Sequence, residues 1–426
     1  MRTPRLRRVR RHPAVPDRCP LGRYRLRRGT ARLAVVCLAA WLGPAPVAAQ
    51  GLPGGPVTLG DGRVVISGDV AVSGAPDDLG FFNYSDYEHS ALREVRVGVA
   101  AEVKASRRLS FLGEVRTGQL AVRPFSLFAR LQPWPGRRIS VQAGRIPPTF
   151  GSYTRRAYSR DNPLIGYPMA YQYLTSLRTD SVPTSTDDLI RMRGRGWLTA
   201  FSEGATHLDR GVPLVTIFSR DTGVQVTASW RALETSASVT LGSPASPVLN
   251  DGNGGVTVAA RAALTPAPGF VLGASFAEGA FLRDSVGTLG TRKGRGGQRV
   301  GGIDLEVAGG RWVTRADVVV SEWRMPVIGG PPLADPLRAV AFALEVRRNV
   351  IPGFYLAGRA ERLTFSTVRT SSGPVSWDAA VTRVEAGVGF SLLHNLVART
   401  TIQLNRRDGG RVTDNLLPAA QLLFWF

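Results

Sequence analysis

The sequence predicts an all-β protein: a transmembrane, antiparallel, up-and-down β-barrel of about 16 strands. Three observations predict it. Apolar residues recur at every second position over segments of 9–12 residues, tight turns alternate with long polar loops, and charges of both signs stand in mid-strand. No stretch after residue 50 reaches the roughly 20 consecutive apolar residues of a membrane helix.

Residues 1–49 look like a signal peptide, and we place the barrel at 50–426. A basic region over 2–32 precedes an apolar core over 33–42, and small residues at 47–49 precede the expected cut. This segment holds 12 of the 54 basic residues and leaves 42 basic against 31 acidic residues in the mature chain. The strongly basic balance of the whole sequence is therefore largely a property of its export signal.

Cysteine and histidine usage excludes several classes of chemistry. Both cysteines, Cys19 and Cys37, lie in the signal segment, so the mature chain has neither a disulfide nor a thiol nucleophile. The mature histidines, His89, His207 and His394, fall in loops or turns, and neither GxSxG nor HExxH occurs. We expect no cofactor, no metal and no catalytic residues, and an outer-membrane lipid-modifying enzyme is only a remote alternative.

The basic stretch KGRGG at 293–297 raises the possibility of a nucleic-acid partner. Export and the lower charge of the mature chain argue against it, and we expect none.

The strands follow from the alternation. In 94–103, valine and alanine at one parity oppose Glu94, Arg96 and Glu102 at the other. A soluble sandwich also alternates, but it turns its apolar face inward, whereas long strands with mid-strand charge suit a barrel with a wet interior. The count is even, as bacterial barrels require. The expected strands are 63–73, 92–103, 109–117, 124–132, 138–145, 221–230, 235–243, 255–264, 270–281, 300–308, 311–323, 338–347, 354–364, 380–392, 396–406 and 415–426.

One connection is far longer than the others. Residues 146–220, after the fifth expected strand, show no alternation and are rich in Tyr, Pro and Arg. A structureless loop of this length is uncommon in a compact domain. We expect it to fold toward the lumen, as a constriction loop of an open pore or as a plug.

The chain ends on LLFWF, in which Leu422, Phe424 and Phe426 alternate. We expect this face to meet lipid, with Trp230 and Trp312 as further aromatics at the membrane interface.

These features together resemble the bacterial outer-membrane porin superfamily: a signal segment, a sixteen-strand rhythm, a terminal Phe and a long loop after strand five. The segment AGRIPPTFGS, 143–152, resembles the phosphate-selective or polyphosphate porin type. The chain departs from that type in having only two lysines, Lys104 and Lys293, where those porins use lysine for their anion path.

The resemblance implies location in the outer membrane of a Gram-negative-type bacterium. It implies passive diffusion of small polar or anionic solutes, a homotrimer as one assembly state, and recognition of Phe424 and Phe426 by the barrel-assembly machinery. A non-conducting structural or adhesive barrel, plugged by its own long loop, is the alternative.

Arginine is the candidate pore-lining residue. Rings of basic side chains favour anions at a constriction, and guanidinium binds phosphate or carboxylate bidentately. Each Arg could instead neutralise a lumen carboxylate, as Arg116 could with Glu114. In the long loop, Asp187 and Asp188 could face a wall of arginines and create a transverse field. The wall candidates are Arg96, Arg116, Arg130, Arg261, Arg315, Arg359, Arg383 and Arg399, and the loop candidates are Arg155, Arg156, Arg160, Arg178, Asp187, Asp188, Arg191, Arg193 and Arg195.

Overall fold

The computed structural model describes residues 55–84, 90–118, 121–134, 138–156, 158–216, 220–246, 255–287, 296–327, 333 and 335–426. The predicted signal segment, the first three residues of the KGRGG stretch and His89 lie outside these described residues. The side chain of Arg155 is likewise outside the description.

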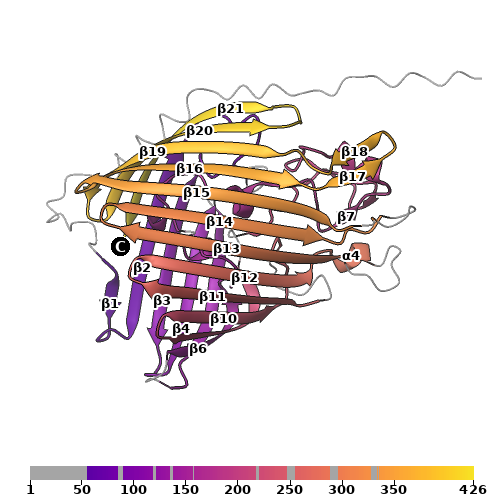
Figure 1. Ribbon diagram of the computed structural model, residues 1–426. Coiled ribbons are helices and arrows are strands. Elements are labelled where there is room, and N and C mark those ends of the chain that lie inside the picture. The colour runs from indigo at the N-terminus through magenta and orange to yellow at the C-terminus, as the bar shows by residue number, and fades with distance from the viewer. Residues whose placement is uncertain are drawn as a thin grey trace, which may run out of the picture. The chain divides into compact units, whose positions relative to one another are not determined.

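Sixteen strands close into an antiparallel barrel, as predicted (Figure 1). Each strand pairs with its sequence neighbour, and the last pairs with the first, with Val70 opposite Phe424. The barrel strands are β2 (Val64–Gly74), β3 (Val95–Lys104), β4 (Leu109–Gly118), β5 (Ala121–Leu131), β6 (Ile139–Ile146), β9 (Asp221–Trp230), β10 (Leu233–Thr240), β11 (Thr257–Ala267), β12 (Phe270–Ala280), β13 (Gly297–Gly309), β14 (Trp312–Trp323), β15 (Leu337–Ile351), β16 (Phe354–Phe365), β19 (Val381–Leu393), β20 (Leu396–Arg407) and β21 (Asp414–Trp425).

Smaller elements decorate the barrel, and the alternation did not predict them. β1 (Val57–Leu59) pairs with the first residues of β2, and β17 (Thr367–Thr370) with β18 (Gly373–Ser376) forms a hairpin where we expected only a polar loop. No helix among the described residues is long and apolar enough to cross a membrane. The remaining elements are η1 (Tyr153–Arg156), η2 (Ser159–Asp161), α2 (Met169–Gln172), β7 (Ser181–Val182), α3 (Thr186–Arg191), β8 (Glu203–Gly204) and α4 (Asp284–Gly287).

The two ends of the barrel differ. At one, the turn end, short connections such as 231–232 and 352–353 join the strands. At the other, the loop end, the long connections gather, including the β17–β18 hairpin and α4 (Figure 1). The predicted alternation of long and short connections therefore corresponds to the two ends of one barrel.

The period-two pattern sorts side chains between the lumen and the outer wall. Along β20, Arg399 and Gln403 are buried inside the barrel, whereas Ile402 and Leu404 are about half exposed on its outside. Successive side chains of a strand point to opposite faces, so a register that buries Arg399 also buries the other residues of the same parity, such as Gln403. At mid-strand the outer wall thus carries exposed apolar side chains and the lumen carries charges.

Candidate functional site in the barrel lumen

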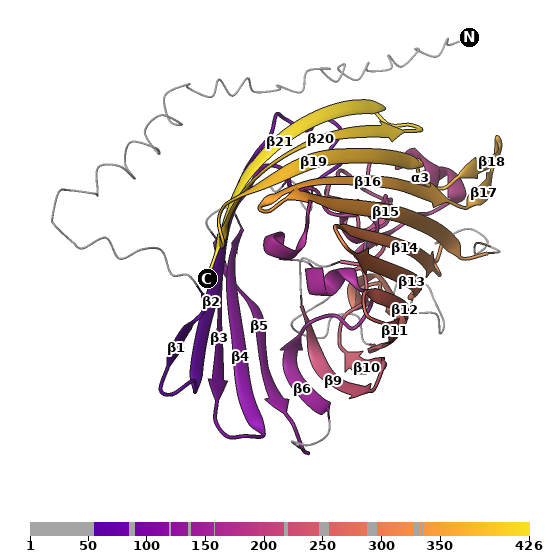
Figure 2. The same ribbon diagram turned by 60° about the vertical axis from the view of Figure 1, so that its left-hand side comes forward.

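The long connection between β6 and β9 runs inside the barrel, where short helical pieces of it lie between opposite walls, whereas α3 lies beside β17 at the loop end (Figure 2). Its hydrogen bonds reach strands on several sides. Tyr158 Oη donates to Glu114 of β4 (2.9 Å), and the N–H of Gly151 donates to Ser275 Oγ of β12 (3.0 Å). From β16, Tyr355 Oη donates to the carbonyl of Pro163 (3.0 Å). The segment therefore lies in the lumen, as the sequence predicts. We call residues 146–220 the lumen segment.

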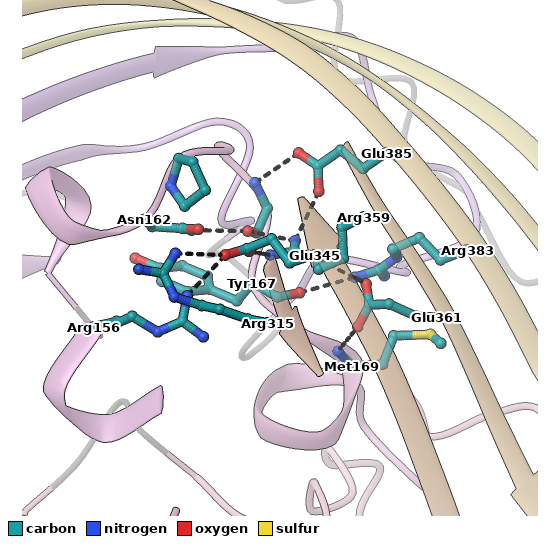
Figure 3. Close-up of polar contacts among 12 residues, drawn as sticks. Arg156, Asn162, Tyr167, Met169, Arg315, Glu345, Arg359, Glu361, Arg383 and Glu385 are labelled. Carbon is teal, nitrogen blue, oxygen red and sulfur yellow. Dashed lines mark hydrogen bonds and ion pairs between the residues drawn. The ribbon is translucent and has the colours of Figure 1, made fainter. Parts of the chain in front are cut away.

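A buried charge cluster on β15, β16 and β19 faces the lumen segment (Figure 3). Arg359 donates to Glu345 (3.2 Å), Glu361 (3.2 Å) and Glu385 (2.8 Å), and it also donates to the carbonyl of Gly166 (2.7 Å). All four ionic side chains are at most 5% exposed. Removing one partner from such a network leaves uncompensated charge in the interior, which is strongly destabilising.

The same cluster supplies hydrogen-bond partners to the irregular backbone of the lumen segment. Glu385 accepts from the N–H of Gly166 (3.0 Å), Glu361 accepts from the N–H of Met169 (2.6 Å), and Arg383 donates to the carbonyl of Tyr167 (3.1 Å). Buried backbone groups outside regular structure need such partners. The charges of the wall therefore hold the segment in place.

Asp378, in the connection before β19, is a second anchor. Its buried carboxylate accepts from the backbone N–H groups of Ser176 and Gly194, both in the lumen segment, and of Ala379, each at 2.7 Å. Burial raises the pKa of Asp378, and the three N–H donors oppose that shift. One side chain thus fixes two points of the segment 18 residues apart in sequence.

Protein fills the lumen around the central part of the lumen segment. Residues 162–179 of the lumen segment are all buried. A loop lying against one wall of an open pore would expose its other side, so burial over this run means that protein surrounds it. The wall side chains that face inward at this level are buried as well: Arg96, Glu114, Gln142, Gln225, Arg261, Asp304, Glu345, Arg359, Arg383 and Gln403.

The loop end of the lumen is filled by apolar side chains. Trp377 packs edge-on against Trp323 of β14 and Phe365 of β16, with ring centroids 5.8 and 4.7 Å apart. Leu189 and Phe201 of the lumen segment belong to the same buried cluster. The lumen segment therefore shares a continuous core with the outer loops.

The turn half of the lumen is wetter. Glu102 and Arg130 form a loose ion pair at 3.9 Å, and their side chains are 29% and 31% exposed. Arg315 is 20% exposed and binds both Glu306 (2.6 Å), itself 38% exposed, and Glu345 (3.2 Å). The lumen thus passes from hydrated mixed charge at the turn end to a packed interior above.

All eight wall arginines predicted from the alternation point into the lumen, and each has a partner. Arg116 pairs with Glu114 (2.6 Å), and Arg399 donates to Gln421 (3.3 Å). Arg261 makes a bidentate pair with Asp304, and Arg96 donates to Tyr167 of the lumen segment. Neutralising pairs with carboxylates are therefore formed by several of these arginines, such as Arg116 and Arg261, whereas the partner of Arg399 named here is a neutral amide. Contact with a passing anion stays a prediction.

The loop candidates separate into two groups. Arg156 and Arg178 are inside: Arg156 binds Glu345 (2.8 Å), and Arg178 binds Asp180 (2.8 Å) together with the carbonyls of Thr199 and His207. Arg160 is half exposed beside Asp161. Arg191 and Arg195 are exposed in or just after α3, with Arg193 partly buried between them.

The expected transverse field is not what the structure shows for the loop carboxylates. Asp188 pairs with Arg191 of its own helix (2.6 Å) and accepts from the N–H groups of Thr184 and Ser202. Burial raises the pKa of the Asp188 carboxyl, but these hydrogen bonds outweigh burial and lower it below its ordinary value. Asp187 accepts weakly from the N–H of Ser371 (3.4 Å). Asp188 is therefore used at the start of its own helix, and Asp187 is directed to the turn between β17 and β18.

Three residues of the lumen segment lie close enough together to act as ligands of one cation. The ligand atoms of Asp180, His207 and Asp209 lie within 4.8 Å of one another. Asp180 is already paired with Arg178, and the His207 side chain is 67% exposed. The group has the composition of a weak surface site and nothing more.

Arg359 and Arg383, which donate to the segment, were predicted to face the lumen, but Glu345 and Asp378, which also hold it, were not named. Glu345 shares its parity along β15 with buried Ala341 and Ala343, so alternation alone could have placed it inside. Asp378 stands in an irregular connection, and no local pattern marks it. Its role depends on a backbone that arrives from residue 176.

The outer wall has the zoning of a barrel in lipid. Exposed aromatics, namely Trp230, Trp312 and Phe390, stand outward near the turn end. The ion pair Arg299–Glu278 stands outward near the loop end, and apolar side chains fill the band between. An apolar band between interfacial aromatic and charged zones is what a transmembrane barrel presents to lipid.

The last strand closes the barrel through the terminal residue. Phe426 exchanges two backbone hydrogen bonds with Gly68, at 2.9 and 3.0 Å. Recognition of Phe424 and Phe426 by an assembly machinery stays a prediction.

No family model matches the sequence, and no curated protein is significantly similar to it. Solved structures are similar in fold. The chain aligns over 85% of its length with OmpF of Salmonella typhi, in complex with daunomycin (12% identity, TM-score 0.50, 97% of that chain). It aligns equally with OmpT, an outer membrane protein of Vibrio cholerae, in its trimer form (12%, TM-score 0.50, 99% of that chain). At such identity the likeness shows the fold alone: the chain is a sixteen-strand antiparallel β-barrel with the fold of these bacterial outer-membrane proteins.

Proposed function

We propose that this barrel is a solute channel of the outer membrane that its own lumen segment closes at rest. When the segment moves, small polar or anionic solutes diffuse through passively. The channel uses no cofactor and performs no catalytic step.

The burial of residues 162–179 is the observation that carries the proposal. A barrel of sixteen strands is wide enough to leave an aqueous channel when its interior is empty. Here the interior is occupied by a segment that is not part of the sheet. Closure is thus a property of the segment, and passage depends on displacing it.

The chemistry of the interface supports a segment that can move. Part of its contact with the wall is ionic and hydrogen-bonded, as in Arg359 with Gly166 or Glu361 with Met169. The rest is an apolar cluster that joins Met169 and Tyr171 to wall residues such as Ala341 and Leu363. Desolvation offsets much of the Coulomb attraction of buried charges, and water entering the lumen can replace such contacts. An apolar interface would have no equivalent partner in water.

The displaced state would expose arginines together with carboxylates. Arg261 with Asp304 and Arg116 with Glu114 would line the same lumen, so we expect only a mild preference for anions. Assembly as a homotrimer belongs to this proposal and is testable by sedimentation in detergent.

Two other functions compete. A permanently closed structural or adhesive barrel is favoured by the continuous apolar core at the loop end. A channel open at rest is favoured by the hydrated turn half around Arg130 and Glu102.

Planar-bilayer conductance of refolded residues 50–426 tests the proposal. Ile146 and Asp221 face each other across β6 and β9, so a short Gly-Ser linker can replace 148–219 and leave an ordinary hairpin. We expect the full chain to conduct rarely and the linker variant to conduct steadily with a mild anion preference. Arg299→Gln, on the outer wall, serves as the control and should behave as the full chain does.

Each other outcome selects a competitor. Steady large conductance of the full chain would mean that the lumen is open at rest. Silence of both proteins, with heat-modifiable migration showing that both are folded, would leave a structural barrel.

A further inference from the structure

A groove on the outer wall, near the loop end, crosses β16, β19, β20 and β21. These four strands lie side by side in Figure 1. The groove has a volume of about 620 Å³, and most of its lining residues stand on the outer face of the strands. It faces the surrounding membrane.

Strand register places the lining in two rows. Arg362, Thr382, Arg406 and Asp414 are successive cross-strand partners and form the upper row. Two residues nearer the turn end, Ala360, Val384, Leu404 and Leu416 are again successive partners and form the lower row. Val384, Leu404 and Leu416 are 46%, 56% and 54% exposed. A polar row therefore stands directly above an apolar row that continues into the lipid-facing band.

We propose that this groove binds the phosphorylated sugar headgroup of an outer-leaflet glycolipid, of the lipopolysaccharide type. The guanidiniums of Arg362 and Arg406 hold phosphate, and the apolar row receives the first segments of the acyl chains. The proposal depends on the outward face of the barrel and is independent of whether the lumen conducts.

Charge and its availability argue for phosphate. Arg362 donates to Thr382 and lies 3.6 Å from Asp408, and Arg406 lies 3.9 Å from Asp414. All four ionic side chains are at least 48% exposed. Exposed ion pairs of this kind contribute little, whereas a phosphate oxygen accepts strong charge-assisted hydrogen bonds from guanidinium.

A row of charged residues on β12 to β15 serves as a comparison, because it differs from the groove in its ion pairing and in the space beside it. There Glu278, Arg299, Glu322 and Arg338 are successive partners, also toward the loop end of their strands. Acid and base alternate, with contacts of 2.7 Å for Arg299–Glu278 and 2.6 Å for Arg338–Glu322. Only about 40 Å³ of space lies beside that row. Its charges satisfy one another, so it lacks the donors and the room of the groove.

The position and the width of the groove indicate which kind of lipid it binds. Long loops of bacterial barrels lie outside the cell and short turns lie toward the periplasm, so the groove lies at the level of outer-leaflet headgroups. Four neighbouring strands span about 14 Å. That width suits a sugar-based headgroup better than one phosphate ester.

Native mass spectrometry of refolded residues 50–426 in nonionic micelles tests the proposal, with diphosphoryl lipid A as the probe. We expect saturable binding that Arg362→Gln with Arg406→Gln weakens by about tenfold. The matched control, Arg299→Gln with Arg338→Gln, removes the same charge from the outer wall near the loop end and should change binding less than about twofold. Arg406→Gln alone, at a side chain 80% exposed, is the second variant should the double variant refold poorly, with about threefold weaker binding expected.

Three results would overturn the proposal. Equal binding of dephosphorylated lipid A would mean that the groove does not recognise phosphate. Equal loss in the two double variants would mean a diffuse belt of charge. Phosphatidylglycerol binding as tightly, with the same arginine dependence, would replace the glycolipid by an ordinary phospholipid.

Discussion

The barrel wall and the lumen segment both need partners for their buried backbone N–H and C=O groups, and they find them in different ways. In the wall, each backbone N–H and C=O finds its partner on the next strand, as Val70 does opposite Phe424. In the lumen segment, regular structure amounts to short pieces such as α2 and α3. Many of its backbone groups are satisfied by side chains of the wall.

The difference shows why the wall is so heavily charged at mid-height. Glu361, Glu385 and Asp378 accept from backbone N–H groups, and Arg359 and Arg383 donate to backbone carbonyls. They act toward the segment as capping residues act toward a helix end. Their charge therefore has a structural use before any solute arrives.

The largest effect should come from removing the centre of the charge cluster. Arg359→Ala would leave Glu345, Glu361 and Glu385 buried without their common partner, and we expect a loss of about 3–5 kcal/mol in the free energy of unfolding. Tryptophan fluorescence during urea unfolding in vesicles measures it. Arg299→Ala, whose pair with Glu278 is half exposed, is the control and should cost less than about 1 kcal/mol. Equal midpoints for the two variants would mean that the cluster is hydrated.

A smaller and more local effect should follow from removing the second anchor. Asp378→Ala leaves the N–H groups of Ser176 and Gly194 buried without their acceptor, at about 1–3 kcal/mol each. We expect faster hydrogen exchange over 162–200 and more frequent channel openings, with the barrel strands still protected. Asp187→Ala, which removes one long contact to Ser371, should leave both unchanged. Exchange that rises equally in strands and segment would show that Asp378 stabilises the whole barrel instead.

The wall could be predicted from the sequence because its constraint is local. Alternation fixes which side chains face inward, and strand number and closure follow from the rhythm of turns, so Arg96 and Arg399 were placed correctly. The β17–β18 hairpin was not predicted, because strands of four residues are too short to show a clear alternation.

The same reasoning predicts where the lumen segment lies but not the conformation that it adopts there. Its length and lack of alternation predict that it leaves the sheet, but its partners lie up to about 200 residues away, as Ser176 and Asp378 do. No local pattern encodes such a pair. The cap of α3 is the exception, because Ser185 followed three residues later by Asp188 is visible in the sequence.

That cap gives the smallest expected effect. Ser185 Oγ accepts from the N–H of Asp188 (3.0 Å), and Asp188 accepts in turn from the N–H groups of Thr184 (3.1 Å) and Ser202 (3.2 Å). Asp188→Ala should destabilise this part of the lumen segment by about 1 kcal/mol, measured as lower exchange protection over 184–204.

The pH dependence of this cap has a definite sign. Because the folded pKa of Asp188 is lowered, its contribution is fully present above the ordinary pKa of 3.8 and is lost as pH falls through the folded value. Protection over 184–204 in the unaltered chain should therefore be constant from pH 7 to 5 and fall below about pH 4. In Asp188→Ala, exchange protection over 184–204 should already be low at neutral pH and should not fall further below about pH 4. An acid step of equal size in the variant would assign it to another carboxylate, and the wall, with its ladder intact, should show no such step in either protein.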